Sequence, residues 1–241
     1  DRDRANFSMA VESLSTLGVR PVVLQLPIME GAKFAGYVDV LAGKAYRFGD
    51  NGAVTECAIP EAMQDEVTIT HDLAVENIAE SDEELLEKYL DEGALSAEEL
   101  HTGLRKGVLT EQIYPVLVTA ALENKGGAAL LSTIEDLFPS PLENPGILDE
   151  AGGTHKVDPE GPLACFVFKS VADPVSGQLY SLLRVLSGTL TSDAQLLNMT
   201  SGETERMGGL LSITGKTTTS CKDAMGPGSI VAVSKLKNTR T

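Results

Sequence analysis

Residues 168–190 read FKSVADPVSGQLYSLLRVLSGTL, and this stretch decides the fold expected for the second half of the chain. Two alternating apolar runs flank Asp173-Pro174-x-x-Gly177, a turn in which proline presets φ and glycine allows a positive φ. Together they predict a β-hairpin. Similar runs, LACFVFK, QLLNM, MGGLLSIT and GSIVAVSKL, lie around it, separated by Gly, Pro, Asp and Ser. We therefore expect residues 162–241 to form a small β-barrel or sandwich.

The residues that precede this all-β region predict a mixed α/β unit. Residues 5–17 place apolar side chains at helical spacing before Gly18, which predicts a helix with a glycine C-cap. Short β-branched and aromatic runs predict strands at 21–27, 34–40 and 46–48, the first of them stopped by its final proline.

Residues 76–100 hold ten acids and one lysine. Their apolar positions are spaced to form one helical face, so the acids are expected to project into solvent. The positions expected on this buried face are Ile78, Leu85, Leu86, Tyr89 and Leu90.

A further helix is predicted to begin after Ser96, because Ser96 and Glu99 have the spacing of a capping box, and to end at Gly107. Residues 114–121 predict a buried strand and residues 127–137 a helix. The expected domains are an α/β region at 1–145, a linker rich in Pro, Gly and acids at 146–161, and the β-barrel at 162–241, whose last strand is expected to be incomplete.

Composition excludes several classes of protein. No apolar run approaches the roughly 18 residues of a membrane span. Cys57, Cys165 and Cys221 lie far apart without C-x-x-C spacing, which disfavours a disulfide framework or a zinc site and favours the reducing cytoplasm. The chain begins at Asp1 without a methionine, so we expect it to be a piece of a longer protein.

The charge is unevenly distributed. The net charge of -16 disfavours DNA as a partner. Residues 162–241 nevertheless carry eight Lys and Arg against five acids, whereas the first 161 residues carry 11 against 30. The two regions are expected to have different partners, or at least different surfaces.

No complete catalytic motif is present in the sequence. Gly215-Lys216-Thr217 lacks a glycine at position 210 and so does not make a phosphate-binding loop. Asn124-Lys125-Gly126-Gly127 lacks the carboxylate that a guanine-reading N-K-x-D needs. The three histidines have no Cys or Asp at ligand or triad spacing and are expected to be surface or linker residues: His71, His101 and His155.

Several stretches, in order along the chain, carry a resemblance to a known family. They are DRDRANF, PVVLQLPIMEGAKFAGYVDVLAGKAYRF, IAESDEELLEKYLDEGALSAEELHTGLRKG, PVLVTAALENKGGAALLSTIEDLFPSP and FVFKSVADPVSGQLYSLLRVLSGTL. Over nearly its whole length the chain resembles translation elongation factor G. The resemblance implies the rear part of a GTPase domain, an inserted subdomain at about 25–106, and the β-barrel called domain II.

The resemblance also implies a set of guanine-binding residues. Asp1 would be the carboxylate of N-K-x-D, and Ala120, Ala121 and Leu122 would form part of the second base-contacting loop. In the family this loop reads Ser-Ala-Phe/Leu-Lys; here Ala120 replaces the serine and Glu123 the lysine, although backbone N–H donors are retained. GTP or GDP and magnesium would be cofactors of the parent protein, and none is expected in the fragment.

The implied partner is the ribosome. The acidic insertion would face the stalk of the large subunit, and the barrel would touch small-subunit ribosomal RNA, with Arg184, Ser187 and Gly188 as candidate contacts. No membrane or DNA contact is implied. Apart from the resemblance, a small barrel would suggest oligonucleotide binding. That function is disfavoured, because such sites need aromatic side chains on which bases stack, and residues 162–241 contain only Phe166, Phe168 and Tyr180.

The leading hypothesis is a fragment of a translational GTPase whose parent hydrolyses GTP during translocation. The fragment itself lacks the phosphate loop and switches and is expected to be inactive. The alternatives are a non-enzymatic ribosome-binding module and a divergent relative, such as a ribosomal protection protein or a release-factor relative.

Overall fold

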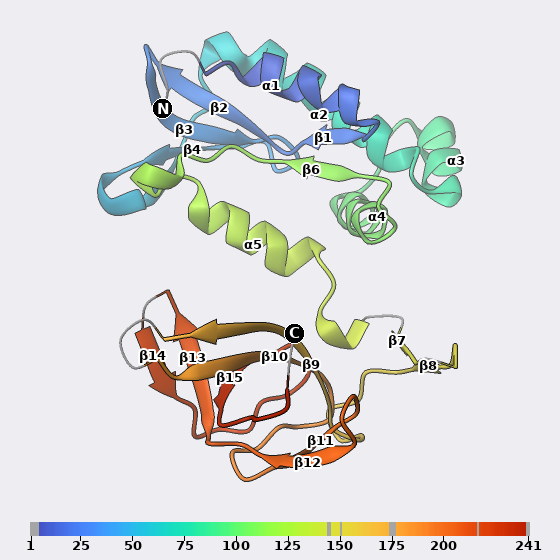
Figure 1. Ribbon diagram of the computed structural model, residues 1–241. Coiled ribbons are helices and arrows are strands. Elements are labelled where there is room, and N and C mark those ends of the chain that lie inside the picture. The colour runs from blue at the N-terminus through green and yellow to red at the C-terminus, as the bar shows by residue number, and fades with distance from the viewer. Residues whose placement is uncertain (1–4, 144–145, 150, 174–176, 216, 240–241) are drawn as a thin grey trace. The chain divides into compact units, whose positions relative to one another are not determined.

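The computed structural model describes residues 5–143, 146–149, 151–173, 177–215 and 217–239. The chain divides into two compact units, Asp1–Phe138 and Pro139–Thr241, which are described separately below (Figure 1).

The N-terminal unit contains two small sheets. Strand β1 (Pro21–Val23) pairs in parallel with β6 (Tyr114–Val116). A four-stranded antiparallel sheet has the order β2 (Gln25–Glu30), β3 (Lys33–Asp39), β4 (Lys44–Phe48) and β5 (Val54–Cys57).

Helices cover these strands on two sides: α1 and α2 lie on one side of β1 and β6, and α5 lies on the other (Figure 1). The α-helices are α1 (Phe7–Leu14), α2 (Gln64–Ala79), α3 (Glu83–Glu92), α4 (Ala97–Leu109) and α5 (Gly127–Leu137). Short 3₁₀ turns are η1 (Ser15–Leu17), η2 (Asp50–Gly52), η3 (Glu61–Met63) and η4 (Ala121–Glu123).

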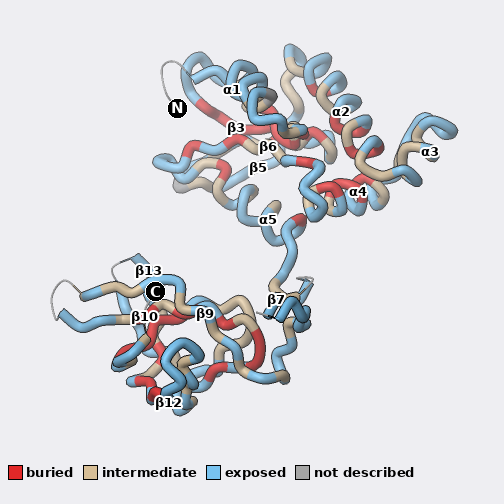
Figure 2. The backbone as a smooth tube through the Cα atoms, turned by 45° about the vertical axis from the view of Figure 1, so that its right-hand side comes forward, coloured by how far each residue is buried: buried red, intermediate tan, exposed pale blue. Residues whose placement is uncertain are grey.

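Buried residues of this unit concentrate in its strands and in α2 and α4, whereas α3 has none (Figure 2). One core cluster joins β1, α2 and α4 around Val22, Ile78 and Leu104. A smaller cluster joins β3 to the segment after β6 through Phe34, Val118 and Ala120. The second cluster matters for the candidate site, because it packs the β2–β5 sheet against the segment where the loop at Ala120 begins.

The strand predicted at 21–27 is two strands, and the prediction that its proline stops it is wrong. The chain passes from β1 into β2, and Pro27 lies within β2 opposite Tyr37. Strand β2 is the outer strand of its sheet, where a residue without an amide N–H is tolerated.

The acidic region from 76 to 100 is also divided. Helix α2 ends at Ala79, and the Asp82 side chain accepts hydrogen bonds from the amides of Glu84 (2.9 Å) and Leu85 (3.2 Å), so it caps α3. The predicted apolar face is wrong at Leu90, which is 74% exposed. The other four positions are buried or partly buried, as expected: Ile78, Leu85, Leu86 and Tyr89.

The predicted capping box of α4 is confirmed, because Ser96 accepts from the amide of Glu99 while Glu99 accepts from that of Ser96. The prediction that Gly107 ends this helix is wrong. Helix α4 runs on to Leu109, and a Cβ at Gly107 would lie 2.5 Å from Cδ1 of Ile113. The glycine is therefore required by packing inside the helix rather than by a turn.

The strand predicted at 114–121 is shorter than expected. It ends at Val116, and the amide of Val118 donates to the buried side chain of Gln25 (3.3 Å) rather than to a strand. The helix predicted at 127–137 is confirmed as α5.

The C-terminal unit is built on a five-stranded sheet with the order β14-β13-β15-β10-β9 and a two-stranded β11-β12 ribbon. A short 3₁₀ turn and a small hairpin precede it: η5 (Pro141–Glu143), β7 (Ile147–Leu148) and β8 (Thr154–His155). The remaining strands are β9 (Ala164–Ala172), β10 (Leu179–Ser187), β11 (Gln195–Asn198), β12 (Glu203–Arg206), β13 (Leu210–Thr214), β14 (Thr217–Ser220) and β15 (Ile230–Ser234).

Each of the predicted alternating runs contains a strand, and their inward side chains form one core around Leu183, Val185 and Val233. Strands β12 and β14 are absent from the predictions. Their sequences, ETER and TTTS, carry no apolar alternation, and all of β14 is exposed.

The opening hairpin is confirmed: β9 and β10 are antiparallel, and the amide of Gly177 donates to the carbonyl of Asp173 (2.9 Å) at a φ of 69°. The turn residues Pro174–Ser176 lie outside the described residues, as do Lys216 and the last two residues of the chain.

Candidate functional site

The loop from Ala120 to Lys125 is a closed turn with an open tip. The amides of Ala120 and Lys125 donate to each other's carbonyls, at 3.0 Å and 3.1 Å. Asn124 takes the left-handed conformation (φ 52°) and turns the chain back. Leu122 at the tip is 85% exposed. The loop is therefore fixed at its base and presents its tip to solvent.

The tip offers backbone donors. The amides of Ala121 and Leu122 make no hydrogen bond to any described residue. Ala120, by contrast, is buried at 3% exposure, and its amide is used inside the loop. Of the three predicted base-contacting residues, two are thus available to a ligand and one supports the loop.

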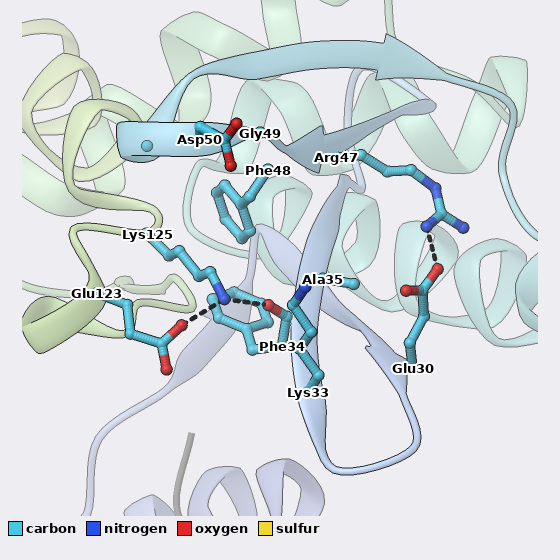
Figure 3. A pocket seen from close by; sticks show the side chains of 11 residues that line it. Glu30, Lys33, Phe34, Ala35, Arg47, Phe48, Gly49, Asp50, Glu123 and Lys125 are labelled. Atoms are coloured by element: carbon cyan, nitrogen blue, oxygen red, sulfur yellow. Dashed lines mark hydrogen bonds and ion pairs between the residues drawn. The ribbon is translucent and has the colours of Figure 1, made fainter.

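The loop is bound to strand β3 of the β2–β5 sheet (Figure 3). The Nζ of Lys125 donates to the carbonyl of Phe34 at the start of β3 (2.9 Å) and also pairs with the Glu123 carboxylate. The hydrogen bond from Lys125 lowers the pKa of the Glu123 carboxyl. The residue that replaces the family's lysine is therefore already paired within the loop.

A groove of about 380 Å³ lies beside this contact (Figure 3). Its lining is strongly polar, and Arg47 forms an ion pair with Glu30 across its rim. The ammonium of Lys33 makes no hydrogen bond or ion pair with a described residue. The groove is lined by Glu30, Lys33, Phe34, Ala35, Arg47, Phe48, Gly49, Asp50, Gly52, Glu123 and Lys125.

The described residues contain no group of three or more His, Cys, Asp and Glu placed to hold a metal ion. Each histidine instead pairs with one aspartate at the surface, as in His101–Asp136 (2.9 Å) and His155–Asp149 (2.8 Å). The three cysteines are free. In the part of the chain that is described, no helix could cross a membrane.

The second predicted group of contacts lies in the C-terminal unit, and the structure separates its members. Arg184 is exposed in mid-strand of β10. Ser187 lies on the opposite, buried face and its hydroxyl donates to the carbonyl of Asp158 (3.0 Å). The amide of Gly188 donates to the same carbonyl (2.7 Å), and a Cβ there would lie 2.6 Å from Cα of Leu163.

The acid-rich helices form the third candidate surface. Eight of the ten acids in residues 76–100 are exposed. The other two are used within the fold: Asp82 caps α3 and pairs with Lys106, and Glu99 caps α4 and pairs with Lys88 (2.5 Å). The hydrogen bonds from Lys88 and from Ser96 lower the pKa of Glu99 to about 2. The surface is thus a solvated carboxylate face on a structured helical support.

Asp1, the remaining predicted base contact, lies outside the described residues. Sequence reasoning missed Lys125, Phe34 and Gly52 as supports of the loop. No local signal could have found them, because Phe34 and Lys125 are 91 residues apart. Asn124-Lys125 matches the first half of a guanine motif in sequence, but the side chain of Lys125 supports the loop instead.

Comparison with known proteins agrees with these observations. Residues 162–241 match the family model described as elongation factor G domain 2. The chain is also similar to a protein from Thermus thermophilus whose crystal structure is known. The two are 30% identical with a TM-score of 0.81, and the match covers 98% of this chain and 33% of that one. The chain therefore spans about a third of the length of that protein.

The fold prediction is confirmed: a mixed α/β unit is followed by a translation-factor-type β-barrel domain. Residues 162–241 are therefore similar to domain 2 of elongation factor G. Taken with the similarity over 98% of the chain, this match supports a resemblance to a portion of elongation factor G that includes domain 2.

Proposed function

We propose that the parent of this chain is a ribosomal GTPase of the elongation factor G type and that this portion supplies ribosome-binding surfaces and part of the guanine site. The observation that carries the proposal is the match of residues 162–241 to domain 2, together with similarity over 98% of the chain to one larger protein. In this proposal the protein works in the cytoplasm, and GTP or GDP with magnesium belongs to the whole protein.

Each candidate surface has a role in the proposal. Residues 1–145 belong to the GTPase domain, with an insertion at about 25–106. The tip at Ala121 and Leu122 contacts the guanine base through backbone donors, with Asp1 as its carboxylate partner. The exposed acids of α2–α4 meet a basic protein of the large-subunit stalk. The barrel meets small-subunit ribosomal RNA, with Arg184 as a phosphate contact and Ser187 and Gly188 shaping the strand end beside it.

The chain itself is not expected to hydrolyse GTP. Phosphoryl transfer depends on a phosphate loop and on residues that position the attacking water, and the 241 residues contain no G-x-x-x-x-G-K-[ST].

Sedimentation with ribosomes through a sucrose cushion tests the proposal. The unmodified chain is expected to pellet with ribosomes, and the double variant Glu87→Lys/Asp91→Lys, which reverses two exposed charges of α3, is expected to pellet about tenfold less. The matched control is Glu135→Lys/Glu160→Lys, which makes the same change of net charge outside the insertion at exposed positions.

Absence of any wild-type binding would overturn the proposed ribosome contact. Equal loss in the control variant would mean that total charge, rather than the insertion, determines the binding. Ribosome binding by a full-length parent that hydrolyses no GTP would favour the alternative of a non-enzymatic ribosome-binding module.

A further inference from the structure

The tip of the Ala120–Lys125 loop has little packing of its own. Its exposed residues, Ala121 and Leu122, contribute no buried side chain, and two hydrogen bonds between Ala120 and Lys125 close its base. A short closed turn with an exposed tip can move as a unit unless something outside it fixes its orientation. The contacts that fix it therefore decide where its backbone donors point.

Lys125 provides one such contact. Its side chain is only 11% exposed, although an ammonium carries three donors and loses stability when buried without partners. Two of its interactions are with the Phe34 carbonyl and the Glu123 carboxylate. The first reaches out of the loop to β3 and the second reaches back into the tip, so the side chain joins the two (Figure 3).

Gly52 provides an independent contact from the turn η2, between β4 and β5. Its φ is +79°, and a Cβ built on it would lie 2.6 Å from the carbonyl oxygen of Asn124. The loop thus lies against η2 on its Asn124 side and is tied to β3 through Lys125. The Lys125 contact comes from a strand of the β2–β5 sheet and the Gly52 contact from the turn that joins two of its strands.

We infer that Lys125 is a positioning residue that fixes the tip at Ala121 and Leu122 to strand β3. The Ala120–Lys125 loop and the β2–β5 sheet then move as one body. The role of the tip in binding a guanine base rests on the proposed function. The anchoring itself rests on the contacts of Lys125 and Gly52.

Hydrogen exchange of the whole chain tests the anchoring. Lys125→Met keeps the aliphatic stem and removes the ammonium. The hydrogen-bonded amides of the loop are expected to exchange about tenfold faster, the factor for losing one charge-assisted hydrogen bond: Ala120, Glu123, Asn124 and Lys125. Gly52→Ala is expected to loosen the same amides from the other side. Lys33→Met is the matched control, because Lys33 lines the same groove and acts on Glu123 through its charge alone, so exchange should change much less than in Lys125→Met. Unchanged exchange in Lys125→Met would overturn the inference.

Titration with guanosine, followed by amide chemical shifts and compared with adenosine, tests the consequence for the base. In the wild-type chain, guanosine is expected to change the amide chemical shifts of Ala121 and Leu122. A change at least fivefold smaller in Lys125→Met, but not in Lys33→Met, supports Lys125 as a positioning residue. Faster exchange with unchanged guanosine shifts would overturn it, leaving Lys125 a purely structural residue. If guanosine binds neither form while exchange still accelerates, the anchoring stands and the proposed guanine role of the loop fails.

Discussion

In each of the two units a largely buried charged side chain ties an irregular segment to a strand. In the N-terminal unit Lys125 ties a loop to β3 through a backbone carbonyl. In the C-terminal unit Glu205 of β12, 7% exposed, accepts hydrogen bonds from the segment that follows β15. Its donors are the amides of Lys237 (2.5 Å) and Asn238 (3.0 Å), the Thr239 hydroxyl (2.7 Å) and the Asn198 amide group (3.1 Å).

The two anchors differ in sign in an informative way. The ammonium lies in the acid-rich first 161 residues, and the carboxylate lies in residues 162–241, where bases outnumber acids. The two anchors also differ in their number of partners. Removing Glu205 leaves four donors without their acceptor, whereas removing Lys125 leaves two acceptors without their donor.

The largest expected effect comes from removing the carboxylate anchor. Glu205→Ala should lower the free energy of unfolding of the C-terminal unit by about 3 kcal/mol, because two backbone amides and two side-chain donors lose their acceptor. Urea unfolding followed by hydrogen exchange of peptides from each unit measures this. Arg206→Ala, at an exposed position of the same strand whose side chain makes no hydrogen bond or ion pair with a described residue, should cost no more than about 0.5 kcal/mol. Equal losses in the two variants would show that Glu205 is not a special anchor.

The same anchor should give the C-terminal unit a pH dependence. Burial acts to raise the pKa of Glu205, but the hydrogen bonds outweigh it and lower the pKa from 4.5 to about 2. Because the folded pKa lies below the unfolded one, this stabilisation is complete above pH 4.5 and is lost as the pH falls toward 2. Stability measured across this window should fall less steeply in Glu205→Gln than in the wild-type protein. Identical slopes would contradict the assignment.

A smaller effect is expected at a local contact of the N-terminal unit. Ser96→Ala removes the hydroxyl of the α4 capping box and should destabilise that unit by about 1 kcal/mol, leaving the C-terminal unit unchanged. Thermal unfolding with exchange readout from α4 checks this. Ser132→Ala, at an exposed position within α5, should have almost no effect. A loss in Ser132→Ala as large as in Ser96→Ala would remove the cap as the explanation.

Predictions from sequence succeeded where the physical cause is local. The capping box, the helix at 127–137 and the β9–β10 hairpin each depend on residues within a few positions of one another. They failed where a distant partner decided the outcome. Gly107 continues a helix because Ile113 packs against it, and Pro27 continues a strand because β2 lies at the edge of its sheet.

The candidate site shows the same division. The choice of the Ala120–Lys125 loop as a candidate followed from its resemblance to a family motif, and the structure shows that Ala121 and Leu122 lie at an exposed tip. Neither its anchor nor the burial of Ala120 could be predicted, because both depend on β3. Likewise, Ser187 and Arg184 are neighbours in sequence but lie on opposite faces of β10.

The sequence by itself determined the order of an α/β unit and an all-β unit, the acid-rich face of the helices and the family resemblance, because periodicity, charge and motif are properties of short segments. Only the tertiary structure decided which charged groups become anchors. Lys125 and Asp82 are ordinary surface residue types in the sequence, and each took its role when folding brought a distant partner, the Phe34 carbonyl or Lys106, within hydrogen-bonding reach. Such partners are chosen by packing of segments far apart in the chain, where the loss of solvent makes each unpaired polar group costly.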